Sequence, residues 1–209
     1  MFTGNVSPAE KKFRSRIIKY LTQSEKQLLT DEIINNSNLS KKHVPFNSKD
    51  EKNNVLRHGK SIYIYDFSRR GHVVEDKTAL FPNTMNLIFN YFPEFTINNL
   101  GRTYWHTLQP EERIDCHHDN VDFYIKDIHR NELKRYHIYL DIPLDAVIVM
   151  DGELRNRYAG DGISNTLIEF NHLDFHYYNN HSDRAITFLV FDLCEKNIRE
   201  QFNSDYINK

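Results

Sequence analysis

The sequence predicts a mainly β protein whose strands form a sandwich or a barrel. From about residue 60 to residue 193 the chain carries short runs of β-branched and aromatic residues, separated by turn-forming segments such as MDGE and AGDG. Aromatic residues are abundant, with 12 Tyr and 14 Phe, whereas the chain has only 7 Gly and 6 Pro, which suits a packed β-rich interior. The 209 residues are enough for one domain with a full core.

The N-terminal part is expected to be helical. Pro8 can begin a helix, and apolar residues recur at helical spacing between residues 13 and 21. Ser24 and Gln27 form a possible capping box ahead of a second apolar stripe, so two helices are predicted between residues 8 and 36. A polar stretch that reads as a loop follows.

The domain organisation follows from this change of pattern. We expect residues 1–50 to be a helical segment of the same domain and residues 51–209 to be the β domain. Asn83 is expected to cap a short helix that Pro93 helps to end. The predicted strands are SIYIYDF before this helix, then TYWHTLQ, VDFYIKDI, RYHIYLDIP, AVIVMDG, TLIEF and AITFLVFDL.

Composition excludes several classes of function. The net charge of −2 gives no large single-sign field, so neither nucleic acid nor an anionic membrane is an expected partner. The chain has no apolar run of membrane-spanning length and no signal-peptide pattern, and its two cysteines do not suggest a disulfide framework. We therefore expect a cytoplasmic protein. The fingerprints GxSxG, HExxH, Walker A and Rossmann are all missing from the sequence.

The stretch RIDCHHDN suggests part of a metal site. On a strand, His117 and Asp119 point to the same face and His118 faces away. A third ligand from another strand would complete a site of two histidines and one carboxylate with open positions, as found in non-haem Fe(II) oxygenases. The candidates for this third ligand are His172, His176 and His181. The residues alone leave the choice among these open.

Three segments strengthen this interpretation because they occur in a familiar order. WHTLQPEERIDCHHD, RYHIYLDIP and GDGISNTLIEFNHLDFHYYNNHSD, which lie between about residues 104 and 192, resemble blocks of the aspartyl/asparaginyl β-hydroxylase family of Fe(II)- and 2-oxoglutarate-dependent dioxygenases. The resemblance implies a cupin-like double-stranded β-helix, or jelly-roll. The N-terminal helices lie outside the resembling region; we expect them to pack on the outside of the β domain, with a dimer contact as the alternative. It also implies Fe(II), 2-oxoglutarate and O2 as cofactors. The expected reaction is hydroxylation of an unactivated C–H of an amino acid or a peptide or protein side chain (Asp/Asn-like), with release of succinate and CO2.

The resemblance assigns roles to individual residues. His117, Asp119 and His176 would be the iron ligands. Arg135 and His137 stand where the family contacts 2-oxoglutarate, which agrees with the ability of a guanidinium to bind a carboxylate through two hydrogen bonds.

Departures from the family pattern leave alternatives open. Where the family has an arginine on the final strand, this chain has Ile186, so Arg184 is the candidate to bind the distal carboxylate, unless Arg135 does so alone. The substrate pocket is expected to include Trp105, Asn120 and Asn180. A non-catalytic cupin-like binding protein and a metal-dependent hydrolase or isomerase are the alternative functions. The protein is expected to be a monomer or a homodimer.

Overall fold

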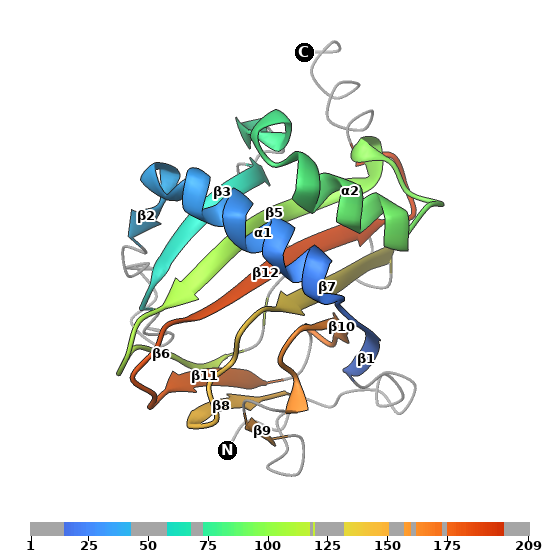
Figure 1. Cartoon of the computed structure of the whole chain (residues 1–209). Coiled ribbons are helices and arrows are strands. Elements are labelled where there is room, and N and C mark those ends of the chain that lie inside the picture. Colours follow the sequence, from blue (N-terminus) through green and yellow to red (C-terminus); the bar gives the residue numbers. More distant parts are fainter. Residues whose placement is uncertain are drawn as a thin grey trace, which may run out of the picture.

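The computed structural model describes residues 15–42, 58–67, 73–117, 119, 132–150, 157–159, 162–172 and 175–198. These residues form two antiparallel sheets, and two helices lie across the outer face of the larger sheet (Figure 1). The predicted mainly β jelly-roll with helices packed outside is therefore confirmed.

The larger sheet has the strand order β1-β10-β7-β12-β5-β3-β2, with β4 paired to β3, and the smaller sheet has the order β6-β11-β8-β9. The strands are β1 (Arg16–Tyr20), β2 (Lys41–Lys42), β3 (Lys60–Phe67), β4 (Val73–Asp76), β5 (Leu100–Leu108), β6 (Arg113–His117), β7 (Leu133–Tyr139), β8 (Ala146–Val149), β9 (Arg157–Ala159), β10 (Thr166–Phe170), β11 (His176–Asn180) and β12 (Ile186–Cys194). The helices are α1 (Gln23–Asn35) and α2 (Pro82–Tyr91), with short 3-10 turns η2 (Ser37–Leu39), η3 (Thr78–Leu80) and η4 (Ile97–Asn99).

Two hydrophobic cores use the two faces of the larger sheet. On the central strand β12, Leu189 and Phe191 pack with the residues that lie under the helices, whereas Phe188 and Val190 pack with residues of the smaller sheet. This alternation is what the period of two along a strand dictates. The inner face of the larger sheet, which carries Phe188 and Val190, is the face on which the candidate site lies.

The N-terminal segment differs from the prediction of two helices. Residues 16–20 form strand β1, which pairs antiparallel with β10, and Arg16 forms an ion pair with Glu169 on that strand. The β-branched pair Ile17 and Ile18 favours a strand once a free sheet edge is available. The helix α1 begins only after Thr22, which forms a capping box with Glu25 in place of the predicted Ser24 and Gln27. Pro8 lies outside the described residues.

The cap of α2 also differs from the prediction. The helix begins with Pro82 directly after Phe81, and Asn83 is not its cap. Instead, the buried carboxylate of Glu32 on α1 accepts hydrogen bonds from the backbone N–H groups of Asn83 (2.6 Å) and Thr84 (2.9 Å) and from the Thr84 hydroxyl. An acidic group at this end of a helix satisfies free N–H groups and suits the helix dipole. The two helices are thereby joined to each other.

Six of the seven predicted strands correspond to β3, β5, β7, β8, β10 and β12. The segment VDFYIKDI lies outside the described residues. The predicted strands do not include β1, β2, β4, β6, β9 and β11, which are short or rich in polar residues. Within the described part of the chain, no helix has the length and apolar character needed to cross a membrane.

Candidate metal and cosubstrate site

The pairing of β6 with β11 brings two histidines together. His117, the last residue of β6, is the direct register partner of His176, the first residue of β11, and their ring centroids are 4.2 Å apart. Asp119 follows β6, and its backbone N–H donates to the carbonyl of His172 at 3.0 Å. This bond holds Asp119 beside both rings.

The three side chains converge on one point. The Nε2 atom of His117 lies 3.5 Å from Oδ1 of Asp119, and Nε2 of His176 lies 3.6 Å from Oδ2 of the same carboxylate. The potential ligand atoms all lie within 4.8 Å of one another. Nitrogen and oxygen ligands about 2.0–2.2 Å from one ion stand at comparable mutual distances, so the set fits a divalent transition metal. Of the three candidate histidines, His176 is the one that lies together with His117 and Asp119 in a group able to hold a metal ion.

The tautomer of His117 is suited to a metal ligand. Its Nδ1 lies 2.7 Å from the backbone carbonyl of Asp115, which can only accept, so Nδ1 carries the proton. The lone pair of the ring is then on Nε2, the atom that faces Asp119. A backbone partner of this kind orients a ligating imidazole.

Arg135 and Asp192 govern the charge of the site. The Nε and Nη2 atoms of Arg135 each donate to an oxygen of Asp192 at 2.7 Å, and its Nη1 donates to Oδ2 of Asp119. Burial alone would raise the pKa of the Asp119 carboxyl, but the positive charge of Arg135, together with His176 and His117, outweighs it and holds the pKa well below its usual value. Asp119 is thus ionised and ready to bind a cation.

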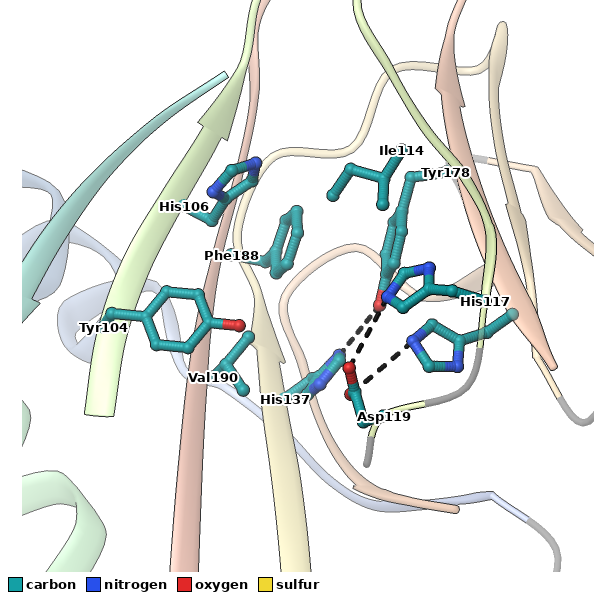
Figure 2. Close-up of a pocket in the computed structure, with 10 residues that line it drawn as sticks. Tyr104, His106, Ile114, His117, Asp119, His137, Tyr178, Phe188 and Val190 are labelled. Carbon is teal, nitrogen blue, oxygen red and sulfur yellow. Dashed lines mark hydrogen bonds and ion pairs between the residues drawn. The ribbon is translucent and has the colours of Figure 1, made fainter. Parts of the chain in front are cut away.

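The convergent side chains open onto a pocket between the two sheets. Figure 2 shows His117 and Asp119 on one side of it and Tyr104 and His106 on the other, with the Tyr104 hydroxyl pointing into the pocket. The lining residues are Tyr104, His106, Ile114, His117, Asp119, His137, His176, Tyr178, Phe188 and Val190. Aromatic rings and histidines predominate among them.

His137 lines this pocket, and its two ring nitrogens have different surroundings. Its Nδ1 lies 2.9 Å from the hydroxyl of Tyr139 and 3.1 Å from that of Tyr178. Its buried Nε2 has no hydrogen-bond partner among the described residues. Burial, followed by Arg135 and His176, lowers the pKa of His137 well below its usual value, so the ring is neutral. Both tyrosine hydroxyls can donate to Nδ1, and in that arrangement the single proton of the ring is on Nε2.

Several predicted site residues lie away from the pocket. Trp105 is buried on the opposite face of β5, where its indole N–H donates to the Thr84 hydroxyl. Asn180 is buried, and its amide donates to the carbonyls of Leu108 and Arg184. The Arg184 side chain is exposed in the bend before β12. None of these three side chains lines the pocket, and Asn120 lies outside the described residues.

Sequence reasoning assigned no role to five residues that line the pocket: His106, Ile114, Tyr178, Phe188 and Val190. It also assigned none to Tyr139, whose hydroxyl lies within hydrogen-bond distance of that of Tyr178. Strand alternation offers a signal for three of these six residues. Tyr139 is two residues after His137, and Tyr178 is two residues after His176, so each shares a face with a predicted site residue. His106 is likewise two residues from Tyr104 on β5.

Comparison with protein families agrees with this geometry. The family model for aspartyl/asparaginyl β-hydroxylase matches residues 23–195. This chain belongs to the aspartyl/asparaginyl β-hydroxylase family. It is accordingly a hydroxylase of the Fe(II)/2-oxoglutarate class, with Fe(II), 2-oxoglutarate and O2 as its cofactors. A comparison of this hydroxylase with curated proteins found no match.

Solved structures with the same fold are distant in sequence. A 2OG-Fe(II) oxygenase family oxidoreductase from Burkholderia pseudomallei is 14% identical with a TM-score of 0.58, covering 90% of this chain and 88% of its own. A prolyl hydroxylase from Trichoplax adhaerens, in complex with a hypoxia inducible factor peptide fragment, is 12% identical with a TM-score of 0.55, covering 91% and 88%. A Pseudomonas putida prolyl-4-hydroxylase is 10% identical with a TM-score of 0.51, covering 87% and 91%. The TM-scores show that these structures share the fold of the β-hydroxylase, and the low identities limit the likeness to the fold.

Proposed function

We propose that this β-hydroxylase family member oxidises an unactivated C–H of an amino acid or of a peptide or protein side chain of the Asp/Asn type, with 2-oxoglutarate converted to succinate and CO2. The observation that carries the proposal is the convergence of His117, Asp119 and His176, whose potential ligand atoms lie within 4.8 Å of one another. We assign these three residues as the iron ligands. Fe(II) and 2-oxoglutarate, when bound, supply the activation of O2 that the reaction needs.

The residues around the ligands perform the other tasks. The neutral ring of His137 offers an Nε2–H donor to a carboxylate of the cosubstrate, and a buried donor without a partner favours such a ligand strongly. Arg135 contributes positive charge near the position proposed for the cosubstrate carboxylate. It is a candidate cosubstrate contact, because its terminal nitrogens have further N–H groups. The aromatic rings of Tyr178 and Phe188 exclude water from this part of the pocket.

The open side of the pocket is the candidate substrate side. Tyr104 is only partly buried, its hydroxyl points into the pocket, and its ring contacts that of Tyr63 on the neighbouring strand. These residues take the place that the sequence suggested for Trp105. The Trichoplax structure holds a peptide, which supports a peptide or amino-acid substrate here.

The N-terminal segment, residues 1–50, is proposed to belong to the same domain as residues 51–209. Strand β1 pairs with β10 at the edge of the larger sheet, and the buried Leu29 of α1 is part of the core under the helices. Location in the cytoplasm and the choice between monomer and homodimer stay predictions.

The direct test is the formation of succinate from 2-oxoglutarate in the presence of Fe(II) and O2, with a panel of peptides and amino acids that contain Asp or Asn. We expect substrate-dependent succinate that is lost in His176→Ala. The exposed-residue variant His181→Ala is the matched control, because His181 is exposed and does not line the pocket. Succinate that never exceeds the level of His176→Ala would favour the alternative of a non-catalytic cupin-like binding protein.

A further inference from the structure

A continuous chain of charged groups lies behind the metal ligands. Asp192 on β12 is the direct register partner of Arg135 on β7, and both side chains are buried on the inner face of the larger sheet. The Asp192 carboxylate accepts two hydrogen bonds from Arg135, each 2.7 Å long, and the remaining terminal nitrogen of Arg135 donates to Oδ2 of Asp119. A single side chain, that of Arg135, therefore connects Asp192 to the candidate iron ligand Asp119.

The buried positive charge of Arg135 opposes cation binding at Asp119, and Asp192 compensates that charge. A buried guanidinium bonded to the only carboxylate ligand would repel a divalent cation and weaken its binding. A buried cation without a second anion is also costly. Asp192 supplies the second negative charge, so that Arg135 is balanced and Asp119 keeps its own charge available.

Close packing of strand β5 against strand β12 fixes the position of the Asp192 side chain. At Gly101 on the adjacent strand β5, an added Cβ would lie only 2.7 Å from the Cβ of Asp192 and 3.2 Å from its backbone oxygen. The absence of a side chain at Gly101 thus lets β5 approach β12 closely at this point. Because the Asp192 carboxylate is held in place, it restricts the orientation of the Arg135 guanidinium.

We propose that Asp192 is a positioning residue for the metal site. It holds Arg135 so that Nη1 binds Oδ2 of Asp119, while Oδ1 of the same carboxylate faces the Nε2 atom of His117. Its charge compensates Arg135, so that Asp119 attracts the cation with its full charge. This inference rests on the proposed function, because it assumes that Asp119 is a metal ligand.

The test measures the binding of Mn(II) alone to the full chain, from the electron paramagnetic resonance signal of free Mn(II). Asp192→Asn keeps the size of the side chain but removes its charge, and we expect the Kd for Mn(II) to rise by about 10- to 100-fold, the usual effect of removing an outer partner of a ligand. The double variant Arg135→Met/Asp192→Asn also removes the uncompensated cation. We therefore expect it to bind Mn(II) more tightly than Asp192→Asn alone.

Glu32→Gln is the matched control. Glu32 is likewise a buried, hydrogen-bonded carboxylate, but it lies between α1 and α2. Its variant should lose stability and keep the wild-type Kd for Mn(II). Circular dichroism and thermal unfolding establish that each variant is folded.

The outcomes separate the inference from the proposed function. If the wild-type protein does not bind Mn(II), the proposed metal site is refuted, and the proposed function with it. If the wild type binds but folded Asp192→Asn has the same Kd, or the double variant shows no recovery, the role of Asp192 is refuted. Should Asp192→Asn not fold, the double variant is compared with Arg135→Met alone. The inference requires similar Kd values for these two, and a tenfold weaker double variant would contradict it.

Discussion

The hydrogen bonds of His137 lead to a prediction about redundancy. The hydroxyls of Tyr139 and Tyr178 lie 3.1 Å from each other, and each is within hydrogen-bond distance of Nδ1 of His137. Either hydroxyl alone can therefore donate to Nδ1 and keep the ring proton on Nε2, which faces the pocket. Tyr139→Phe and Tyr178→Phe should each leave the tautomer unchanged. In the double variant no hydroxyl donates to Nδ1, so the ring proton should no longer be restricted to Nε2.

The expected magnitude follows from the bond that Nε2–H makes to the cosubstrate. A hydrogen bond to a charged group contributes about 1.5–3 kcal/mol, which corresponds to roughly a 10- to 150-fold change in Kd. Each single variant should change the Kd for 2-oxoglutarate by no more than about threefold, and the double variant should approach the full loss, a strongly non-additive pattern.

The assay is an anaerobic titration of the Fe(II)-loaded protein with 2-oxoglutarate, followed by visible absorption, and nitrogen NMR of the histidine ring reports the tautomer. Tyr65→Phe is the control, since Tyr65 is a buried tyrosine in the core under the helices. A single variant as damaging as the double variant would refute the redundancy. So would a double variant that binds 2-oxoglutarate as the wild type does.

Three further predictions concern residues whose positions the structure defines. Arg184→Ala should leave the Kd for 2-oxoglutarate unchanged in the same titration, because the side chain is exposed and does not line the pocket. Glu32→Gln should lower the free energy of unfolding by about 1–3 kcal/mol in urea, because the N–H groups of Asn83 and Thr84 lose a charged acceptor. The pKa of His137 lies well below its ordinary value in the folded protein, so only the unfolded chain takes up this proton below about pH 6.5. Apo-protein should therefore lose stability as the pH falls from 6.5 toward 5, and His137→Gln should show a shallower loss in urea titrations at each pH.

The sequence predicts the β architecture and the residue types of the site because both depend on local patterns. Strand alternation places His117 beside Asp119 and Arg135 beside His137 without knowledge of the fold. Alternation does not tell which face of a strand points inward. For this reason Trp105 was expected in the pocket, although its neighbour Tyr104 lies there.

Features that depend on distant partners could not be predicted from the sequence. The pairing of Asp192 with Arg135 joins positions 57 residues apart, and only the register of β7 with β12 brings them together. Residues 16–20 are a strand because the edge of β10 is available, and an apolar spacing compatible with a helix carries no information about that edge. The cap of α2 is likewise supplied from another helix by Glu32.

The most direct test of the account is the formation of the Fe(II)–2-oxoglutarate chelate. Fe(II) and 2-oxoglutarate are added to apo-protein without oxygen, and the weak visible charge-transfer band is recorded, which requires no knowledge of the substrate. We expect a saturable band in the wild type that is absent in Asp119→Ala and weaker in Arg135→Ala. Wild-type protein that binds Fe(II) but gives no band at saturating 2-oxoglutarate would contradict the proposal that this site carries out oxygenase chemistry.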